Sequence, residues 1–178
     1  MGQWIDVQTL IWILPIMFIL HDFEEIIMVE KWMSQNSKKI FERLPTKIAN
    51  VVIRQFSMTT AQFAVAVLVI FLFVSGSTIM ANQYLINGSF VYIYPFIIVT
   101  LIFFLHAFTH IAQSIFWGSI TPGAITSVII IIPYSVVLYN ALLINEMITW
   151  KVIFICLPFG LLFIPIALFS HWIGKKVV

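Results

Sequence analysis

Four ionisable side chains stand close together within a long apolar stretch, in the run His21-Asp22-Phe23-Glu24-Glu25. An ionisable side chain costs about 2.5–3.5 kcal/mol in hydrocarbon by insertion scales, so such residues face a protein interior, pair with one another or bind an ion. His21, Glu24 and Glu25 are spaced i, i+3, i+4 and therefore share one face of a helix. The spacing fits either ligands that converge on one metal or a proton relay.

A later segment offers a second pair of candidate ligands, His106 and His110, which are spaced i, i+4 and share a helix face. Tryptophan marks membrane interfaces, and His106 precedes Trp117 by eleven residues, just as His21 precedes Trp32. The second histidine of the pair and the second glutamate of the run each precede the same tryptophans by seven residues. If both helices run in the same direction, these side chains lie at matching depths in the cytoplasmic half of the membrane.

The candidate site therefore combines imidazoles and carboxylates without a thiolate, which favours a divalent transition metal, zinc first and iron second. The candidate metal ligands are His21, Glu25, His106, His110 and His171. His171 adjoins Trp172, so an interfacial side chain that reaches toward water is an equal interpretation of it. Glu24 and Glu25 are the candidate catalytic residues. Glu25 is predicted to be a metal ligand at the level of His110, and Glu24 is predicted to be a general base or proton carrier.

Three other interpretations use the same residues. The carboxylates could exchange protons or cations in a transporter or sensor, or the polar side chains could only join helices by hydrogen bonds. Carboxylate-bridged metal pairs in helical bundles use similar Glu and His spacings, so a di-iron oxidative enzyme is also permitted.

Asp22 points about 100° away from His21 around the helix, which favours a supporting hydrogen bond over metal ligation.

The composition excludes an ordinary soluble domain. Of 178 residues, 62% are hydrophobic and only 9% charged, which leaves too few charges for a water-exposed surface. We expect an all-α polytopic membrane protein with one domain, residues 1–178, whose partners are the lipid bilayer and a lipid or membrane-associated peptide. The basic residues are too few for nucleic-acid binding.

Five apolar segments are predicted to span the membrane. They run from about Trp4 to Trp32, Ser57 to Met80, Tyr92 to Trp117, Pro122 to Leu143 and Trp150 to Trp172. The basic segment Asn36–Arg54 between the first two is predicted to form an interfacial helical connection, and a solvated basic loop is an equal interpretation of it. Before the fourth span, Thr121 is predicted to cap the helix, with Pro122 at its first position.

The basic residues predict the orientation. Six of the nine Lys and Arg residues lie between Lys31 and Arg54, and Lys175 and Lys176 end the chain. With five spans these two regions share one side of the membrane, which the positive-inside rule assigns to the cytoplasm. We therefore expect a multi-pass protein of the cell membrane with its N-terminus outside and its C-terminus in the cytoplasm.

The run His21-Asp22-Phe23-Glu24-Glu25 resembles the signature of the HXXEE-motif family of small bacterial membrane proteins, whose function is unassigned. The His106/His110 segment and the stretch Pro122-Gly123-Ala124-Ile125-Thr126 are also similar to that family. The resemblance implies that His21, Glu24 and Glu25 are the defining residues, but it implies no activity.

Together these observations favour a membrane-embedded, metal-dependent enzyme, most simply a hydrolase of a lipid or a membrane-associated peptide. The metal would be bound by histidines and one glutamate, and it would activate a water molecule.

Overall fold

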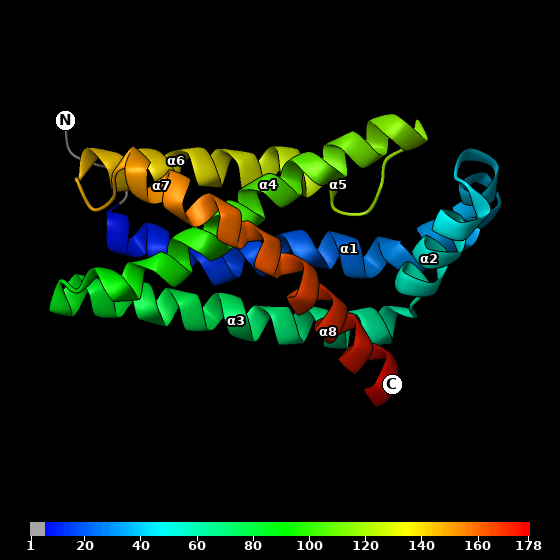
Figure 1. Cartoon of the computed structure of the whole chain (residues 1–178), viewed down its shortest axis with the longest axis horizontal. Helices are drawn as coiled ribbons and strands as arrows, with labels where there is room; N and C mark the ends of the chain where they lie inside the picture. Colours follow the sequence, from blue (N-terminus) through cyan, green and yellow to red (C-terminus); the bar gives the residue numbers. More distant parts are fainter. Residues whose placement is uncertain (1–5) are drawn as a thin grey trace.

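A computed structural model describes residues 6–178, and this part of the chain contains helices and no strand (Figure 1). The α-helices are α1 (Val7–Arg43), α2 (Thr46–Phe56), α3 (Thr60–Asn87), α4 (Ile93–Trp117), α5 (Ala124–Thr126), α6 (Ile132–Ile144), α7 (Trp150–Cys156) and α8 (Phe163–Val177). The 3₁₀ segments η1 (Phe90–Tyr92) and η3 (Leu157–Leu162) and the π-helical segment η2 (Ser127–Ile131) join some of these helices. The predicted start of the first segment, Trp4, lies outside the described residues.

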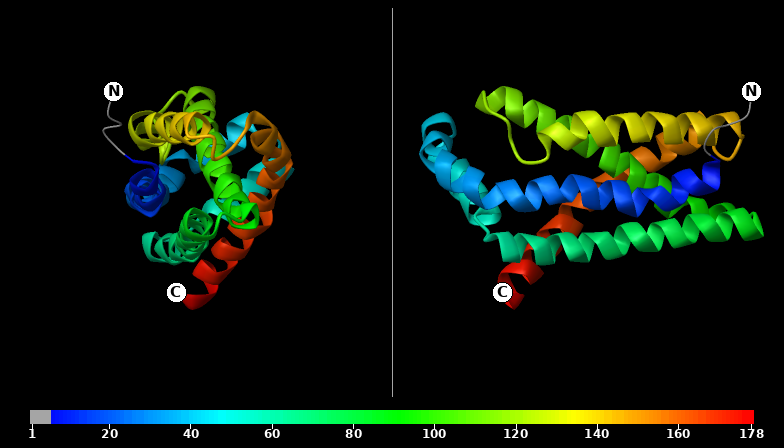
Figure 2. Two further views of the ribbon diagram at one scale, coloured as in Figure 1. Left: turned by 90° about the vertical axis from the view of Figure 1, so that its left-hand side faces the viewer. Right: turned by 180° about the vertical axis from the view of Figure 1, so that it is seen from behind.

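Four helices among the described residues are long and apolar enough to cross a membrane, and the prediction of five was wrong. They are Thr60–Asn87, Phe90–Trp117, Ala124–Ile144 and Trp150–Val177. The missing member is α1, because its 37 residues include the buried polar side chains of the motif and a charged C-terminal third. Nevertheless α1 packs between α3 and the α5–α6 segment (Figures 1 and 2), and the face of α1 turned away from them exposes apolar side chains such as Ile16 and Ile27.

The connection after α1 is shorter than predicted, because α1 continues to Arg43. Pro45 then ends the helix, since the residue before a proline is pushed out of the helical region, and Leu44 is extended. Lys39 and Arg43 donate hydrogen bonds to the last backbone carbonyls of α4, which a helix leaves unpaired. The C-terminal end of α1 is thus hydrogen-bonded to the C-terminal end of α4.

The connection between α4 and α5 also differs from the prediction. Thr121 does not cap the following helix, which begins at Ala124 after Gly123 in a left-handed conformation. Instead, the Thr121 hydroxyl donates to the backbone carbonyl of His110 at 3.1 Å and hydrogen-bonds Ser114 at 2.7 Å. The turn is therefore folded back onto α4.

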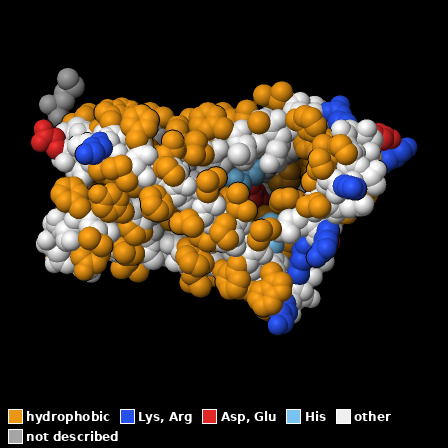
Figure 3. All heavy atoms as spheres, in the orientation of Figure 1, with side chains coloured by type: hydrophobic (Ala, Val, Ile, Leu, Met, Phe, Trp, Pro, Cys, Tyr) orange, Lys and Arg blue, Asp and Glu red, His pale blue; other side chains and the backbone are white. Residues whose placement is uncertain are grey.

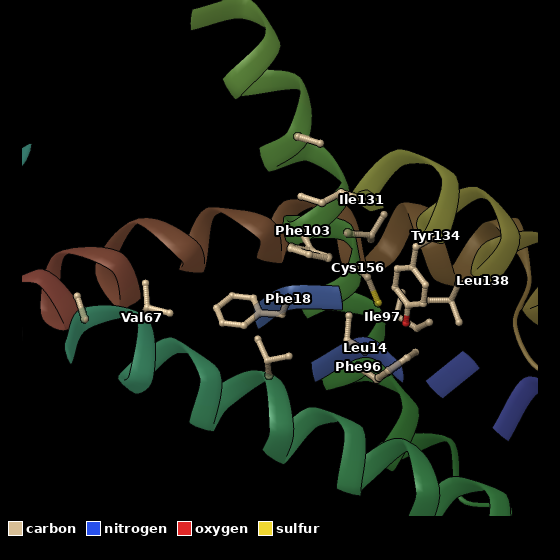
Figure 4. Close-up of a cluster of buried hydrophobic side chains, with 14 of the residues drawn as sticks. Leu14, Phe18, Val67, Phe96, Ile97, Phe103, Ile131, Tyr134, Leu138 and Cys156 are labelled. Atoms are coloured by element: carbon tan, nitrogen blue, oxygen red, sulfur yellow. The ribbon is translucent and has the colours of Figure 1, made fainter. Parts of the chain in front are cut away.

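The apolar core lies between α1, α3, α4 and α6. Figure 4 shows Leu14, Phe18, Phe96 and Leu138 pointing into one cluster of buried side chains. Around the outside, apolar side chains are exposed over most of the length of the bundle (Figure 3), as expected of a surface that faces lipid. The polar site lies at one end of this core, toward α2.

Candidate metal centre

Four predicted site residues come together: His21 and Glu25 from α1, and His106 and His110 from α4. One ligand atom from each lies within 4.8 Å of every other. Oε1 of Glu25 is at the middle of the group, 2.7 Å from Nε2 of His110, 3.4 Å from Nε2 of His106 and 3.5 Å from Nε2 of His21. The Nε2 atoms of the two α4 histidines are 2.7 Å apart.

Helix geometry positions these residues. Each helix contributes an i, i+4 pair, so both side chains of a pair leave the same face. The indole rings of Trp32 and Trp117, which were used to match the depths of the two helices, contact each other with centroids 6.0 Å apart. His21 and His106 each precede the tryptophan of their helix by eleven residues, and Glu25 and His110 by seven. The two pairs therefore lie at the same height along the bundle.

The cluster is largely shielded from its surroundings. His21, Glu25 and His110 are buried, with 1%, 8% and 6% of their surface exposed. The edge of the Phe103 ring borders His21, with ring centroids 5.8 Å apart. Hydrogen bonds and ionic contacts are stronger in such an apolar surrounding than in water, and unpaired polar atoms are correspondingly costly.

Three buried atoms of this cluster have no assigned hydrogen bond within residues 6–178: Nε2 of His21, Oε1 of Glu25 and Nδ1 of His110. Nε2 of His21 and Oε1 of Glu25 face each other at 3.5 Å, and Oε1 also has the ionic contact with Nε2 of His110 at 2.7 Å. The carboxylate oxygen can only accept, and a cation between the two atoms would satisfy both of them. Three imidazole nitrogens around one carboxylate oxygen also form a ligand set that suits zinc or iron. The residues present therefore fit a single metal ion.

Gly123 closes the cluster from the side of the α4–α5 connection. A Cβ atom at this position would lie 2.8 Å from Oε1 of Glu25, 2.8 Å from Cε1 of His21 and 2.9 Å from Cε1 of His110. Its φ of +79° is also in the left-handed region, which glycine adopts readily. Only a glycine backbone fits this close against the ligands.

Glu24 is directed away from the other four residues. Its Oε2 accepts hydrogen bonds from the backbone N–H of Thr126 at 2.7 Å and from the Thr126 hydroxyl at 2.6 Å, and its Oε1 accepts from the N–H of Ile125 at 3.2 Å. The predicted role as a general base conflicts with this placement, because the carboxylate is already engaged by three donors. Thr126 also contacts Nδ1 of His21 at 2.8 Å.

His171, the fifth predicted ligand, is not a member of this cluster. Its Nδ1 is 3.0 Å from the side-chain amide of Gln55, and its ring packs edge-on against Phe56 and Phe63. It joins α8 to α2 and α3, and the interfacial interpretation describes this residue better than metal ligation does.

Asp22 is buried as well, with 5% of its surface exposed, and its Oδ2 has no hydrogen-bond partner in the described part of the chain. It does not belong to the four-residue group.

The cluster is open toward one face of the molecule. Figure 3 shows a hollow in which histidine and carboxylate atoms are visible, between apolar side chains and the basic end of the bundle. The His106 side chain is 25% exposed, against 7% for His110 and 10% for Glu25. A molecule could therefore approach the centre from the His106 side.

Sequence reasoning missed Gly123 as a site residue and Thr126 as the partner of both Glu24 and His21. Their roles depend on how the α4–α5 connection folds back, which no periodicity encodes. Two signals were available: Pro122-Gly123, because Pro-Gly marks a turn, and the similarity of the stretch from Pro122 to Thr126 to the HXXEE-motif family.

The comparisons with known proteins add a family but no activity. No curated protein matches this chain, and no solved structure matches it. A family described as "protein of unknown function with HXXEE motif" matches residues 12–138, a range that holds all four clustered residues. The match covers well over half of the chain, and this protein belongs to the HXXEE family.

Proposed function

We propose that this protein binds one divalent transition metal within the membrane and uses it to hydrolyse a lipid or a membrane-associated peptide. His21, Glu25, His106 and His110 would hold the metal, with zinc first and iron second among the candidates. The observation that supports this most directly is the convergence of four ligand atoms, all within 4.8 Å of one another, together with the buried Nε2 of His21, which has no hydrogen-bond partner within residues 6–178.

The arrangement favours one metal over a bridged pair. Pairs of iron ions in helical bundles are bridged by several carboxylates. Within residues 6–178, Glu25 is the only carboxylate of the cluster, because Glu24 is held by α5 and Asp22 lies outside it. A di-iron enzyme is therefore a weaker proposal than a mononuclear site.

In the proposed reaction, a bound metal would polarise the substrate carbonyl or phosphoryl group and make water a better nucleophile. The three imidazoles are neutral ligands that fix its position. Glu25 would contribute negative charge through Oε1, and we propose that its second oxygen takes the proton, since Glu24 is already hydrogen-bonded by Thr126. The burial of Glu25, which is 8% exposed, limits the access of bulk water to its carboxylate.

The position of the hollow supports an amphiphilic substrate. It lies on the apolar face of the bundle but close to the basic residues of α2 and the end of α8 (Figure 3). An acyl chain or an apolar peptide segment could enter from the lipid, while its polar group stays near the basic end. We propose that the substrate reaches His106 by this route.

Metal content tests the proposed site. Purified wild-type protein should contain about one equivalent of metal by mass spectrometry, and Glu25→Gln should contain far less, because it loses a charged ligand. Glu42→Gln is the matched control: Glu42 is also on α1, but it makes only an exposed ion pair with Lys38 at 3.8 Å. Full occupancy of Glu25→Gln, or no metal in wild type after reconstitution with zinc or iron, would refute the metal site.

Hydrolysis is tested separately. Metal-loaded protein is placed in vesicles of phosphatidylethanolamine and phosphatidylglycerol, and released fatty acids and headgroups are measured by mass spectrometry. A parallel sample contains the same vesicles with transmembrane peptides added, and peptide fragments are measured in it. Product should form in one of the two samples with wild type and Glu42→Gln but not with Glu25→Gln. Absence of product from both would remove hydrolysis while leaving the metal site standing.

One observation favours a second function, a proton-coupled transporter or sensor: Asp22 is buried with Oδ2 unpartnered among residues 6–178, one helical turn from Glu25. Carboxyl groups of this kind form proton relays in membrane proteins. Proton uptake into proteoliposomes under an imposed potential distinguishes the two. Flux in wild type that Asp22→Asn abolishes, with metal content unchanged, would favour transport.

A further inference from the structure

Glu24, Thr126 and His21 form a chain of hydrogen bonds that ends on Nδ1 of His21, the ring nitrogen of this candidate ligand that does not face Glu25. Oε2 of Glu24 is 2.6 Å from Oγ1 of Thr126, and this oxygen is 2.8 Å from Nδ1 of His21. The chain connects α1 to the start of the Ala124–Ile144 helix and back to α1. Its far end, Nε2 of His21, is the buried atom that faces Glu25.

The direction of these hydrogen bonds follows from counting protons. A threonine hydroxyl has one proton to donate and can accept through its lone pairs. Besides His21, the Thr126 oxygen has two partners, the Glu24 carboxylate at 2.6 Å and the carbonyl of Gly123 at 3.4 Å. Both partners can only accept, so the single proton of Thr126 is given to one of them. The shorter contact, to the charged carboxylate, is the stronger.

The Thr126 oxygen must therefore accept from His21, and this requires a proton on Nδ1 of the imidazole. A neutral imidazole carries a proton on one nitrogen only, so Nε2 is left with a free lone pair. That lone pair points at the position between His21 and Glu25 where the proposed metal would lie. Ligating histidines are commonly held in this way by a hydrogen bond at the other ring nitrogen.

We propose that Thr126 and Glu24 are positioning residues that fix His21 in the Nδ1–H form, so that its Nε2 is ready to bind metal. This inference rests on the proposed metal site and gives Glu24 a role different from that of a general base. Within the described residues, His21 is the histidine of the cluster whose Nδ1 has a short hydrogen bond. Nδ1 of His110 has no hydrogen-bond partner there, and Nδ1 of His106 reaches Thr109 only at 3.4 Å.

The test uses variants of Thr126 that differ in the hydroxyl. Thr126→Val keeps the shape and removes the hydroxyl, whereas Thr126→Ser keeps it. Thr78→Val is the matched control, since Thr78 is buried in α3 and its hydroxyl bonds only the Val74 carbonyl of its own helix. Metal affinity is measured by competition with a chromophoric chelator in detergent. Thr126→Val should bind metal about 10–100-fold more weakly, while Thr126→Ser and Thr78→Val stay close to wild type.

A second measurement uses the metal-free protein. Long-range proton–nitrogen NMR at about pH 8, where a histidine with an ordinary pKa is neutral, reports which ring nitrogen carries the proton. Wild type should show His21 with the proton on Nδ1, and its signal is assigned by its loss in His21→Gln. Thr126→Val should show a mixture of both forms.

Glu24→Ala gives an independent variant if Thr126→Val fails to fold. Without the carboxylate that accepts it, the Thr126 proton is free to bond Nδ1 of His21. The proton of His21 should then move to Nε2. Wild type with the proton on Nε2, or unchanged His21 signals in both variants, would overturn the inference. Absence of metal from wild type would overturn the proposed function instead, and the NMR result would still decide this inference.

Discussion

Gly123 shows how a single backbone position determines whether the centre can form. The atoms closest to its missing Cβ are ligand atoms or ring carbons of His21, Glu25 and His110, at 2.8–2.9 Å. The sequence indicated a turn here but could not indicate a contact with the ligands, because the contact arises only when the turn folds back onto α4. In contrast, the ligands themselves were predictable from helical spacing and depth.

We expect Gly123→Ala to lose the proposed metal binding, because the added methyl group would displace at least one of the candidate ligands His21, Glu25 and His110. Gly118→Ala is the matched control: Gly118 also has a positive φ, +61°, but nothing lies within 4 Å of its Cβ position. Both variants pay about 1–2 kcal/mol for a left-handed alanine, so only the metal content should separate them. Equal metal content in the two purified variants would show that Gly123 matters for the turn alone.

At the scale of the elements, apolar length predicted the four candidate spans well and the first helix poorly. The segments predicted from Ser57, Tyr92, Pro122 and Trp150 each correspond to one continuous helical stretch of the structure. The first helix was predicted as a span because its N-terminal half is apolar. Its buried polar residues and its extension to Arg43 give it a different composition from the other four. Helix ends also differ by several residues where capping, rather than hydropathy, decides them.

The crossing of α8 over α3 depends on Gly174. A Cβ atom there would lie 2.3 Å from the backbone oxygen of Gln62, so an alanine would force the two helices apart. Small residues permit such close helix contacts in membranes. We expect Gly174→Ala to lower the free energy of unfolding by about 1–3 kcal/mol, measured by denaturation in mixed micelles.

Gly76→Ala in α3 is the control for that measurement. Nothing lies within 4 Å of its Cβ position, and alanine favours a helix by about 0.8–1.0 kcal/mol over glycine. Its stability should equal or exceed that of wild type. If Gly174→Ala is as stable as Gly76→Ala, the α3–α8 crossing is looser than the close approach of the backbones implies.

At the scale of the whole molecule, the basic residues gather at one end of the bundle. Lys175 donates to the backbone carbonyls of Arg54 and Gln55 at 2.5 and 3.0 Å, which joins the end of α8 to the end of α2. Figure 3 shows Lys and Arg side chains concentrated at this end. In contrast, α7, which carries Lys151 in its first turn, begins near the opposite end of the bundle (Figure 1). This arrangement supports the proposal that the basic end faces the cytoplasm.

The orientation can be tested with cysteines at Lys38 and Lys151, labelled in intact cells by a maleimide that does not cross membranes. Native Cys156 is buried, with 1% of its surface exposed, so its background should be small. We expect Lys151→Cys to react in intact cells and Lys38→Cys to react only after permeabilisation, because positively charged segments stay inside. The reverse pattern would place the basic end outside. Glu25 lies seven residues, or about 10 Å, from Trp32 along the helix. The reverse pattern would therefore also place the proposed metal centre in the outer half of the membrane.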